Sequence, residues 1–476
     1  MTYQLSPLRH PAPVSVRKAR PGGAGSWGAA WPKVSIHLPI CNAPPEIVRA
    51  TLDALAALDY DRFEVLVIDS NTTDPQLWEP VAEHCARLGP KFRFFTLGRH
   101  QGFKAGALNF ALGETAPDAE LIGVIDSGDI VAPDWLRAMA PAFAEPKLGL
   151  AQSRQDDHDG SLFQRLMFGE RAGFTLVRKQ ALLDAEGWAE WCSAAEAELS
   201  LRLLRAGYEA GRAEKSFGKN AMPDDFAAFR ARRERGAYGA MRILRANADA
   251  LFNPFNPELT PRQRWQLVAG WLPWIGDALG LVCLAMGLAW SAGLILGEAG
   301  FAFPIALFVL PSIGLLAFKV AQMFALSGRG GLRGRIGAAV AGLALSHSTA
   351  KAVWRGLLTN RPPAPVRGQA VARQEFWPLL LIWGALLWVG LFHHGATPAT
   401  KLGCAVLFAQ SLPYLAAVGV SLLARPSRRP KPAPAKASVR PPDRRSGGDR
   451  AGKEKNFAAQ GRVAHLFLAA RRSSRA

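Results

Sequence analysis

The stretch Gly102-Phe103-Lys104-Ala105-Gly106-Ala107-Leu108-Asn109 predicts a helix that carries a lysine in its first turn. A later apolar run, Leu121–Ile125, predicts a strand that ends at Asp126. Helix N-termini and lysines attract phosphate groups, and carboxylates can hold a bridging cation. Together these two elements predict a binding site for a nucleotide diphosphate.

The sequence around this stretch predicts a parallel sheet. A helical pattern from Pro44-Pro45 to about Leu58 separates the first two of three further apolar runs, which are Val34–Leu38, Phe63–Ile68 and Phe92–Phe95. Strands that alternate with helices form parallel sheets covered on both faces, and ligands bind beyond the carboxyl ends of their strands. We therefore expect three segments that follow strands to share one rim: Pro39–Ala43, Asp69–Thr73 and Asp126–Asp129.

From about Ala269 onward the chain has long segments almost free of charge, each near the ~20 residues that a bilayer requires. The candidate spans are Ala269–Leu296, Phe301–Phe324, Phe376–Phe392 and Leu402–Leu423. The segment near 336–358 carries polar and charged residues, so we expect a helix in the membrane interface there. We expect four crossings, because four keep the basic loop at 325–374 and the basic tail on the cytoplasmic side with the head, whereas five would export the tail.

The charge of the chain is concentrated at its C-terminal end. The net charge is +19, and residues 425–476 hold 15 Lys and Arg against 3 Asp and Glu, a net charge of +12. Their Pro, Ser and Gly content predicts a disordered tail. Beside a membrane span, an anchor to anionic lipid or a solvated tail is favoured over a nucleic-acid arm, because aromatic residues for base stacking are lacking.

The five cysteines lie far apart and form no Cys-x-x-Cys pair, so the sequence predicts neither a cysteine metal site nor a disulfide framework. Residues 1–31 contain no apolar core, so we expect no signal peptide there. We expect four regions: a disordered N-terminus (1–31), a cytosolic head (32–255), a membrane region (256–424) and the basic tail (425–476).

The order of the motifs is similar to that of the family 2 glycosyltransferases, and among them the membrane-embedded, cellulose-synthase-like β-glucan synthases. The residues that carry this resemblance lie between about 32 and 363: Val34–Pro39, Val67–Asp69, Gly102–Asn109, Val124–Asp126, Gly187–Cys192, Gly207–Ala210 and Gly270–Asp277. The resemblance implies a nucleotide-binding, GT-A-like α/β head with a parallel sheet, followed by an α-helical transmembrane region. It also implies sugar transfer from a nucleotide-sugar donor, expected to be UDP-glucose, with Mg²⁺ or Mn²⁺ on the diphosphate.

The resemblance also assigns roles to individual residues. Asp69 matches the acidic residue that contacts the nucleoside, and Lys104 matches the lysine beside the diphosphate. Asp126 begins the motif that binds the donor and its metal ion. Glu196 matches the general base, and Arg235 the cation beside the leaving group.

Three of these motifs depart from the family pattern. Asp-x-Asp reads Asp126-Ser127-Gly128-Asp129, so both carboxylates can share a cation only if the chain turns at Gly128. Thr-Glu-Asp reads Ala194-Ala195-Glu196, which places a longer side chain at the base. Gln-x-x-Arg-Trp reads Arg232-Arg233-Glu234-Arg235-Gly236, which keeps Arg235 and loses the aromatic ring for the acceptor sugar.

Two functions remain open at this point. One is an active transferase in the inner membrane of a bacterium, with head and tail cytoplasmic, that acts on a polysaccharide or another acceptor. The other is a catalytically impaired relative that binds a nucleotide or serves as a scaffold. In both cases we expect membrane lipids, and other polysaccharide-synthesis subunits, as partners.

Overall fold

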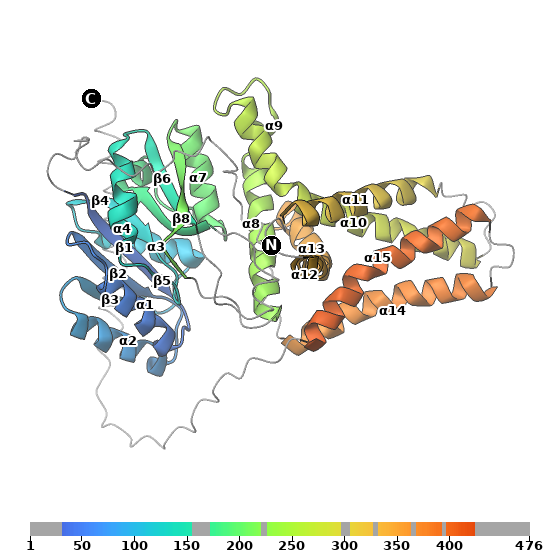
Figure 1. Ribbon diagram of the computed structural model, residues 1–476, viewed down its shortest axis with the longest axis horizontal. Helices are drawn as coiled ribbons and strands as arrows, with labels where there is room; N and C mark the ends of the chain where they lie inside the picture. The colour runs from blue at the N-terminus through green and yellow to red at the C-terminus, as the bar shows by residue number, and fades with distance from the viewer. Residues whose placement is uncertain are drawn as a thin grey trace, which may run out of the picture.

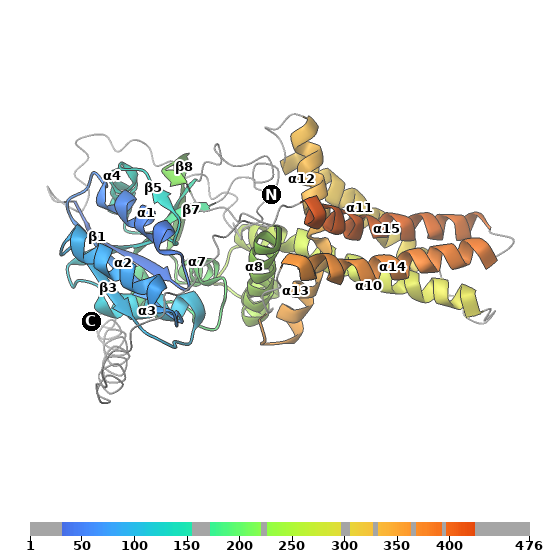
Figure 2. The same ribbon diagram turned by 90° about the horizontal axis from the view of Figure 1, so that it is seen from below.

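The computed structural model describes residues 31–154, 172–219, 226–296, 305–326, 332–362, 368–392 and 397–423. It consists of an α/β head, the long helix α8 (Phe226–Ala246) beside the head, and a set of long helices that extend away from both (Figure 1). The view from below shows the same division (Figure 2). The predictions made for residues 1–30 and for the tail from 424 onward lie outside the described residues.

The head is built on a seven-stranded sheet in the order β3-β2-β1-β4-β7-β6-β8. Its strands are β1 (Lys33–Ile40), β2 (Phe63–Asp69), β3 (Phe92–Thr96), β4 (Ala119–Val124), β6 (Leu148–Arg154), β7 (Ala172–Arg178) and β8 (Glu209–Ser216). The four predicted strands are the parallel set β1 to β4, as expected. β7 runs antiparallel to both of its neighbours, so the sheet is rich in parallel pairs without being wholly parallel.

Helices cover both faces of the sheet, which confirms the predicted α/β fold. On one face α1 (Pro45–Ala56), α2 (Pro75–Leu88) and the short α4 (Trp135–Met139) pack against alternate residues of β1 such as Ile36 and Leu38. On the other face α3 (Phe103–Glu114), α6 (Lys179–Asp184) and α7 (Ala195–Arg205) pack against Ile122 and Val124 of β4. Because both faces are covered, every residue of β2 is buried, which explains its unbroken apolar sequence.

Smaller elements complete the head and join it to α8. The turn η1 (Ala140–Ala144) follows α4, and β5 (Ile130–Val131) pairs with β9 (Gly218–Lys219) in a separate two-stranded sheet. The short helix α9 (Ala248–Phe252) follows α8 and leads toward the helical region.

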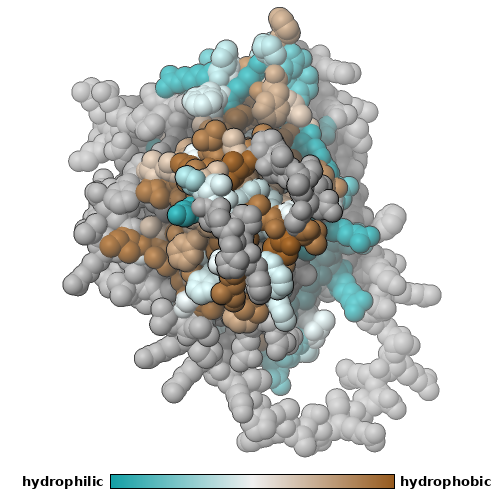
Figure 3. Space-filling view, turned by 90° about the vertical axis from the view of Figure 1, so that its right-hand side faces the viewer, coloured by the Kyte–Doolittle hydropathy of each residue, from teal (hydrophilic) through white to brown (hydrophobic). Residues whose placement is uncertain are grey.

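Four long apolar helices form the outer part of the helical region: α10 (Pro261–Leu296), α11 (Ala306–Leu326), α14 (Gly368–Phe392) and α15 (Pro398–Leu423). Within the described residues, three of them are long and apolar enough to cross a membrane, namely α10, α14 and α15. The apolar part of α11 is shorter, Ala306–Ala321, and the first residues of the predicted span at 301–324 lie outside the described ranges. Apolar side chains gather at the outer end of this region (Figure 3).

The segment near 336–358, for which the sequence predicted one helix, contains two. α12 (Leu332–Ala344) ends before Leu345, and α13 (Ser346–Leu358) continues with one face buried. α13 packs on α10, where the Trp354 indole donates a hydrogen bond to the Ala278 carbonyl at 3.2 Å. It also packs on α8, where Arg245 donates to the Leu357 carbonyl at 3.0 Å. These contacts join the helix beside the head to the apolar helices.

Candidate active site

The loops after β1, β2 and β3 form one connected rim at the carboxyl end of the sheet. Asn42 and Asn71 adopt left-handed backbone conformations with φ of 47° and 60°. The Asn42 amide donates to the Asn71 carbonyl, and the Asn71 side chain accepts a hydrogen bond from the His100 N–H at 3.1 Å. Asparagine tolerates this conformation because its short polar side chain can bond locally. The rim is therefore ordered by its own hydrogen bonds.

Asp69 lies inside this rim rather than on its surface. It is 1% exposed, and its carboxylate accepts hydrogen bonds from Thr72 Oγ1 at 2.6 Å and Thr96 Oγ1 at 3.4 Å. Thr72 in turn accepts the backbone N–H of Asn42 at 2.9 Å. Burial raises the pKa of Asp69, although both threonines act against this rise. In this geometry Asp69 positions the loops, and its contact with a nucleoside stays a prediction.

The first turn of α3 is shaped by two glycines. Gly102 has a φ of 88°, and a Cβ atom there would lie 2.7 Å from the Glu190 carboxylate. A Cβ atom on Gly106 would lie 2.2 Å from the Gln101 carbonyl oxygen. Neither position can therefore hold a side chain without displacing the backbone or Glu190. The close packing places Lys104 in the first turn of the helix, at the rim.

The chain turns at Gly128, which the sequence permitted without requiring it. Gly128 has a φ of 92°, its N–H donates to Thr51 Oγ1 at 2.9 Å, and the Asp129 N–H donates to the Asp126 carbonyl at 3.1 Å. The turn brings the two carboxylates together at the end of β4, but in different roles. Asp129 is buried and accepts the backbone N–H of Asp126 at 3.0 Å, whereas Asp126 projects from the rim.

Lys104 links Asp126 to Glu196 and is the centre of the site. Its Nζ lies 2.6 Å from Asp126 Oδ1 and 2.8 Å from Glu196 Oε1. The three side chains are partly exposed, at 33% for Lys104, 54% for Asp126 and 35% for Glu196. They come from α3, from the turn after β4 and from the first turn of α7. The fold therefore joins three of the six predicted site residues through their side chains, with Asp129 held next to them by the Asp126 N–H.

Glu196 and its neighbour Glu198 have different surroundings. Glu198 is buried, and both of its oxygens accept hydrogen bonds from Arg202 Nε at 2.8 and 2.9 Å, one turn along α7. Glu196 instead faces the rim. Glu198 is therefore held within the head by Arg202, whereas the carboxylate of Glu196 lies at the rim with Lys104.

Burial and neighbouring charges shift the pKa values of Lys104, Asp126 and Asp129. Burial acts against the charge of Lys104, but Asp126 and Glu196 outweigh it and raise the pKa of the ammonium. Desolvation acts against the charge of Asp126 as well, but Lys104 outweighs it and keeps the pKa of that carboxyl below its usual value. Burial and then the charge of Asp126 raise the pKa of Asp129 to about 8. At neutral pH Asp126 is therefore the charged member of the pair.

A clamp that the sequence did not predict fixes α7 relative to α3. Asn109 Nδ2 donates to the Trp188 carbonyl at 2.9 Å and to Glu190 Oε1 at 2.8 Å, and Asn109 Oδ1 accepts the Trp188 N–H at 2.8 Å. These bonds tie the loop before α7 to the helix that carries Lys104. The motifs that contain Asn109 and Trp188 were recognised, but only the fold shows that they meet.

The motif Arg232–Gly236 lies on α8, close to this site. Its contacts differ from those that the resemblance implies. Among the described interactions, none joins the Arg235 side chain to Asp126 or Glu196; its backbone carbonyl accepts Ser193 Oγ at 3.2 Å. The positive charge of Arg232, one turn earlier, favours the charged forms of Asp126 and Asp129, but it is a smaller influence than Lys104 on Asp126 and does not offset the burial that raises the pKa of Asp129. A Cβ atom on Gly236 would meet nothing within 4 Å, so no close contact requires a glycine there.

The donor set of the rim fits a divalent cation only in part. Mg²⁺ is typically held by one or two carboxylates together with substrate phosphates, and Asp126 suits that role. One oxygen of Asp129 is already engaged by the Asp126 N–H. Within the described residues no group of three or more His, Cys, Asp or Glu side chains could hold a metal ion. The substrate phosphates would have to supply the remaining ligands.

Comparison with known proteins identifies the family of this chain. Residues 35–187 match the model of glycosyl transferase family 2, and residues 154–320 match that of glycosyl transferase family group 2. The chain belongs to glycosyltransferase family 2. Its site residues from Asp69 to Glu196 lie within these two matches, and the resemblance inferred from the motifs is confirmed.

The names of the relatives of this family 2 chain refer to different sugars. A glucomannan 4-β-mannosyltransferase of Cyamopsis tetragonoloba is 27% identical over 45% of this chain and 46% of its own length. The UDP-forming cellulose synthase catalytic subunit of Pseudomonas fluorescens is 26% identical over 37% of this chain and 27% of its own length. The chain thus spans about half or less of the length of these relatives.

One solved structure is similar to part of this chain. It is a mannosyltransferase from Pyrobaculum calidifontis in complex with GDP-mannose and Mn²⁺, 19% identical in sequence. The similarity covers 69% of this chain and 88% of that one, with a TM-score of 0.47.

Proposed function

We propose that this chain is a membrane-bound glycosyltransferase that transfers a sugar from a nucleotide-diphosphate donor to a growing polysaccharide or another acceptor. The observation that carries the proposal is the convergence of Lys104, Asp126 and Glu196 at the carboxyl end of the sheet. This is where parallel α/β sheets bind nucleotides. The three residues supply a cation for phosphate, a carboxylate for a metal ion and a base for a hydroxyl.

The reaction follows from the chemistry of these groups. Glu196 accepts the proton of an acceptor hydroxyl, and the hydroxyl oxygen forms a bond to the anomeric carbon of the donor sugar. The bond from that carbon to the diphosphate breaks, and the nucleoside diphosphate leaves with the electron pair. Attack from the opposite side inverts the anomeric centre. A divalent cation held by Asp126, with Asp129 beside it, would neutralise charge on the diphosphate.

Lys104 has to change partners for this reaction to proceed. In the structure its ammonium donates a hydrogen bond to Glu196 Oε1 at 2.8 Å, so this oxygen of the proposed base is already engaged. A diphosphate at the start of α3 competes for the same ammonium. Donor binding would therefore draw Lys104 away from Glu196 and release the base only when a sugar is available.

The donor and the membrane topology extend the same proposal. UDP-glucose is the first donor to test, and a nucleotide-mannose donor such as GDP-mannose is the second because a related protein is named a glucomannan mannosyltransferase. We further propose that α10, α11, α14 and α15 cross the membrane, which would place the head and the basic tail together on the cytoplasmic side. Arg235 remains a candidate for the leaving group, with Arg232 as a second cation on the same helix.

The test is a transfer assay on the full chain in detergent, with labelled UDP-glucose or GDP-mannose and Mg²⁺ or Mn²⁺. We expect donor hydrolysis or a labelled product that depends on Glu196. If every donor and metal combination yields neither, the proposal of an active enzyme is wrong.

A catalytically impaired nucleotide-binding scaffold is the second candidate. Two observations favour it: Gly236 provides no ring for an acceptor sugar, and Asp129 turns its carboxylate to the backbone. Donor binding measured beside turnover separates the two candidates, because a scaffold would bind the nucleotide and leave it unchanged.

A further inference from the structure

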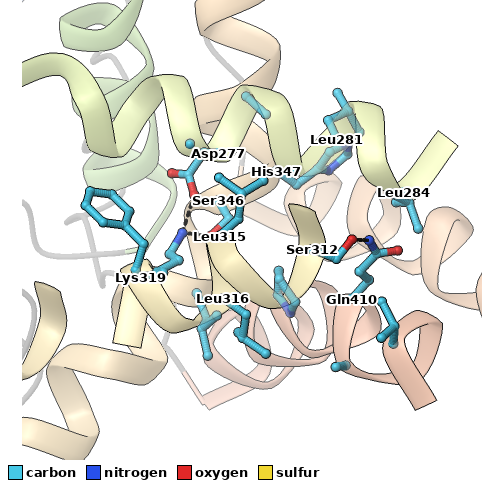
Figure 4. A pocket seen from close by; sticks show the side chains of 18 of the residues that line it. Asp277, Leu281, Leu284, Ser312, Leu315, Leu316, Lys319, Ser346, His347 and Gln410 are labelled. Atoms are coloured by element: carbon cyan, nitrogen blue, oxygen red, sulfur yellow. Dashed lines mark hydrogen bonds and ion pairs between the residues drawn. The ribbon is translucent and has the colours of Figure 1, made fainter. Parts of the chain in front are cut away.

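The helical region contains a cavity distinct from the rim site. It has a volume of about 240 Å³ and lies among α10, α11, α13 and α15 (Figure 4). Most of its wall is apolar and includes Leu281, Leu284, Leu315 and Leu316. Gly276 and Gly280 of α10 leave room on one side.

Polar groups occupy two places in this cavity. Toward one end Lys319 is bonded to both Asp277 and the Ser346 hydroxyl. Toward the other, Gln410 Nε2 donates to Ser312 Oγ at 2.6 Å, while the buried Gln410 Oε1 has no hydrogen-bond partner. A buried acceptor without a donor is costly, and a ligand hydroxyl would satisfy it.

The cavity continues into a groove on the outside of the helices. This groove, of about 680 Å³, shares Leu281, Leu284, His347 and Tyr414 with the cavity. Its outer wall is formed by large apolar side chains of α14 that are 45% to 67% exposed, namely Trp377, Leu380 and Leu381. If these helices cross a bilayer, as proposed above, the groove opens sideways to lipid chains.

We propose that the cavity and groove bind one neutral lipid with a free hydroxyl in its headgroup, of the diacylglycerol type. The headgroup lies in the cavity, where its hydroxyl donates a hydrogen bond to Gln410 Oε1. The acyl chains lie in the groove. The leucine-rich wall suits hydrocarbon better than a glycan, whose many hydroxyls would be left without partners.

The charges of the cavity select against an anionic headgroup. Among the described residues that line it, Lys319 is paired with Asp277, and His347 with Glu375 at 2.5 Å. A phosphate would have to break one of these pairs, because the described lining of the cavity includes no other cationic side chain. A neutral headgroup leaves both pairs intact.

The test is native mass spectrometry of the full chain in detergent with added diacylglycerol, and separately with phosphatidic acid that has the same acyl chains. The decisive variant is Gly280→Phe, since a Cβ atom there meets nothing within 4 Å and the ring would fill the cavity. Gly390→Phe is the matched control, because Gly390 has equally open space on the exposed face of α14 and does not line the cavity.

We expect one diacylglycerol per chain in the wild type and in Gly390→Phe, and at least tenfold less in Gly280→Phe. Gln410→Leu should retain the lipid but lose the preference for diacylglycerol over its methyl ether. Equal binding by Gly280→Phe, preferential binding of phosphatidic acid, or occupancy by detergent alone would overturn the proposal. Since the measurement uses no nucleotide sugar, its outcome is separate from that of the transfer assay.

Discussion

Replacing Lys104 by methionine should weaken donor binding while leaving the fold intact. The new side chain keeps a similar length and loses the ammonium that contacts Asp126 at 2.6 Å and Glu196 at 2.8 Å. Because all three side chains are at least a third exposed, each ion pair is expected to contribute only ~0.2–1 kcal/mol to folding. The total loss of folding stability should therefore stay below about 2 kcal/mol.

The effect on the donor should be larger than the effect on the fold. A hydrogen bond between a charged group and its partner contributes ~1.5–3 kcal/mol. Its loss corresponds to a Kd that rises about 10- to 150-fold. Equilibrium dialysis of labelled UDP-glucose and GDP-mannose against the detergent-purified chain measures this change, and a thermal melt measures the fold.

Lys33→Met is the matched control for this substitution. Lys33 makes a similar ion pair with Asp118 at 2.8 Å, but it lies at the start of β1, at the opposite end of the sheet from the rim. The control should melt nearly as Lys104→Met does and bind the donor as the wild type does. An unchanged donor Kd in a folded Lys104→Met protein, or an equal loss in both variants, would refute the role assigned to Lys104.

Three further predictions address other parts of the molecule. Glu196→Gln should lower turnover in the transfer assay by ~10²–10⁴-fold with little change in donor Kd. The control is Glu79→Gln, an exposed position on α2, which should keep full turnover. Full activity of Glu196→Gln would show that Glu196 is not the general base. Gly236→Trp should fold, because its Cβ atom meets nothing within 4 Å, and should lower the acceptor KM; an unchanged KM would mean that the acceptor does not pass this face of α8. Burial and then Lys179 lower the pKa of His37 to about 3, so below about pH 6.5 the unfolded chain binds a proton that the folded chain does not. Stability should then be lost on acidification at up to ~1.4 kcal/mol per pH unit between pH 6.5 and 3, and denaturant melts of His37→Asn should show a flatter profile than the wild type; equal slopes would contradict this.

The first four strands of the head were predictable because burial on both faces of the sheet leaves unbroken apolar runs. β1 to β4 and α3 follow directly from such runs. The later strands were not identified, since β6 and β8 mix apolar with polar residues. The direction of β7 depends on pairing with β4 and β6, which are distant in sequence, and no local pattern marks it.

The membrane region was predictable mainly in the length of its apolar segments. All four predicted spans overlap long helices. The division at Leu345 was missed because Ser346 and His347 were treated as polar residues of one interfacial helix. In the fold they begin a separate helix, and its buried face meets α8 and α10.

The candidate site was predictable in its residue types and less so in its contacts. The motif order indicated that Lys104, Asp126 and Glu196 belong together, and the structure joins them directly. The burial of Asp69 depends on hydroxyls from two separate loops, which spacing in the sequence does not reveal. The sequence permitted a turn at Gly128, but the return of the Asp129 carboxylate to the Asp126 N–H depends on side-chain geometry within the turn.

Titration calorimetry of the full chain with UDP-glucose and with GDP-mannose, in the presence of Mg²⁺, tests the account most directly. We predict one binding site per chain with a Kd of about 1 mM or tighter for at least one of the two donors, as is common for enzyme substrates. The absence of binding by both donors, and by UDP and GDP alone, would contradict the assignment of the rim as a nucleotide-sugar site.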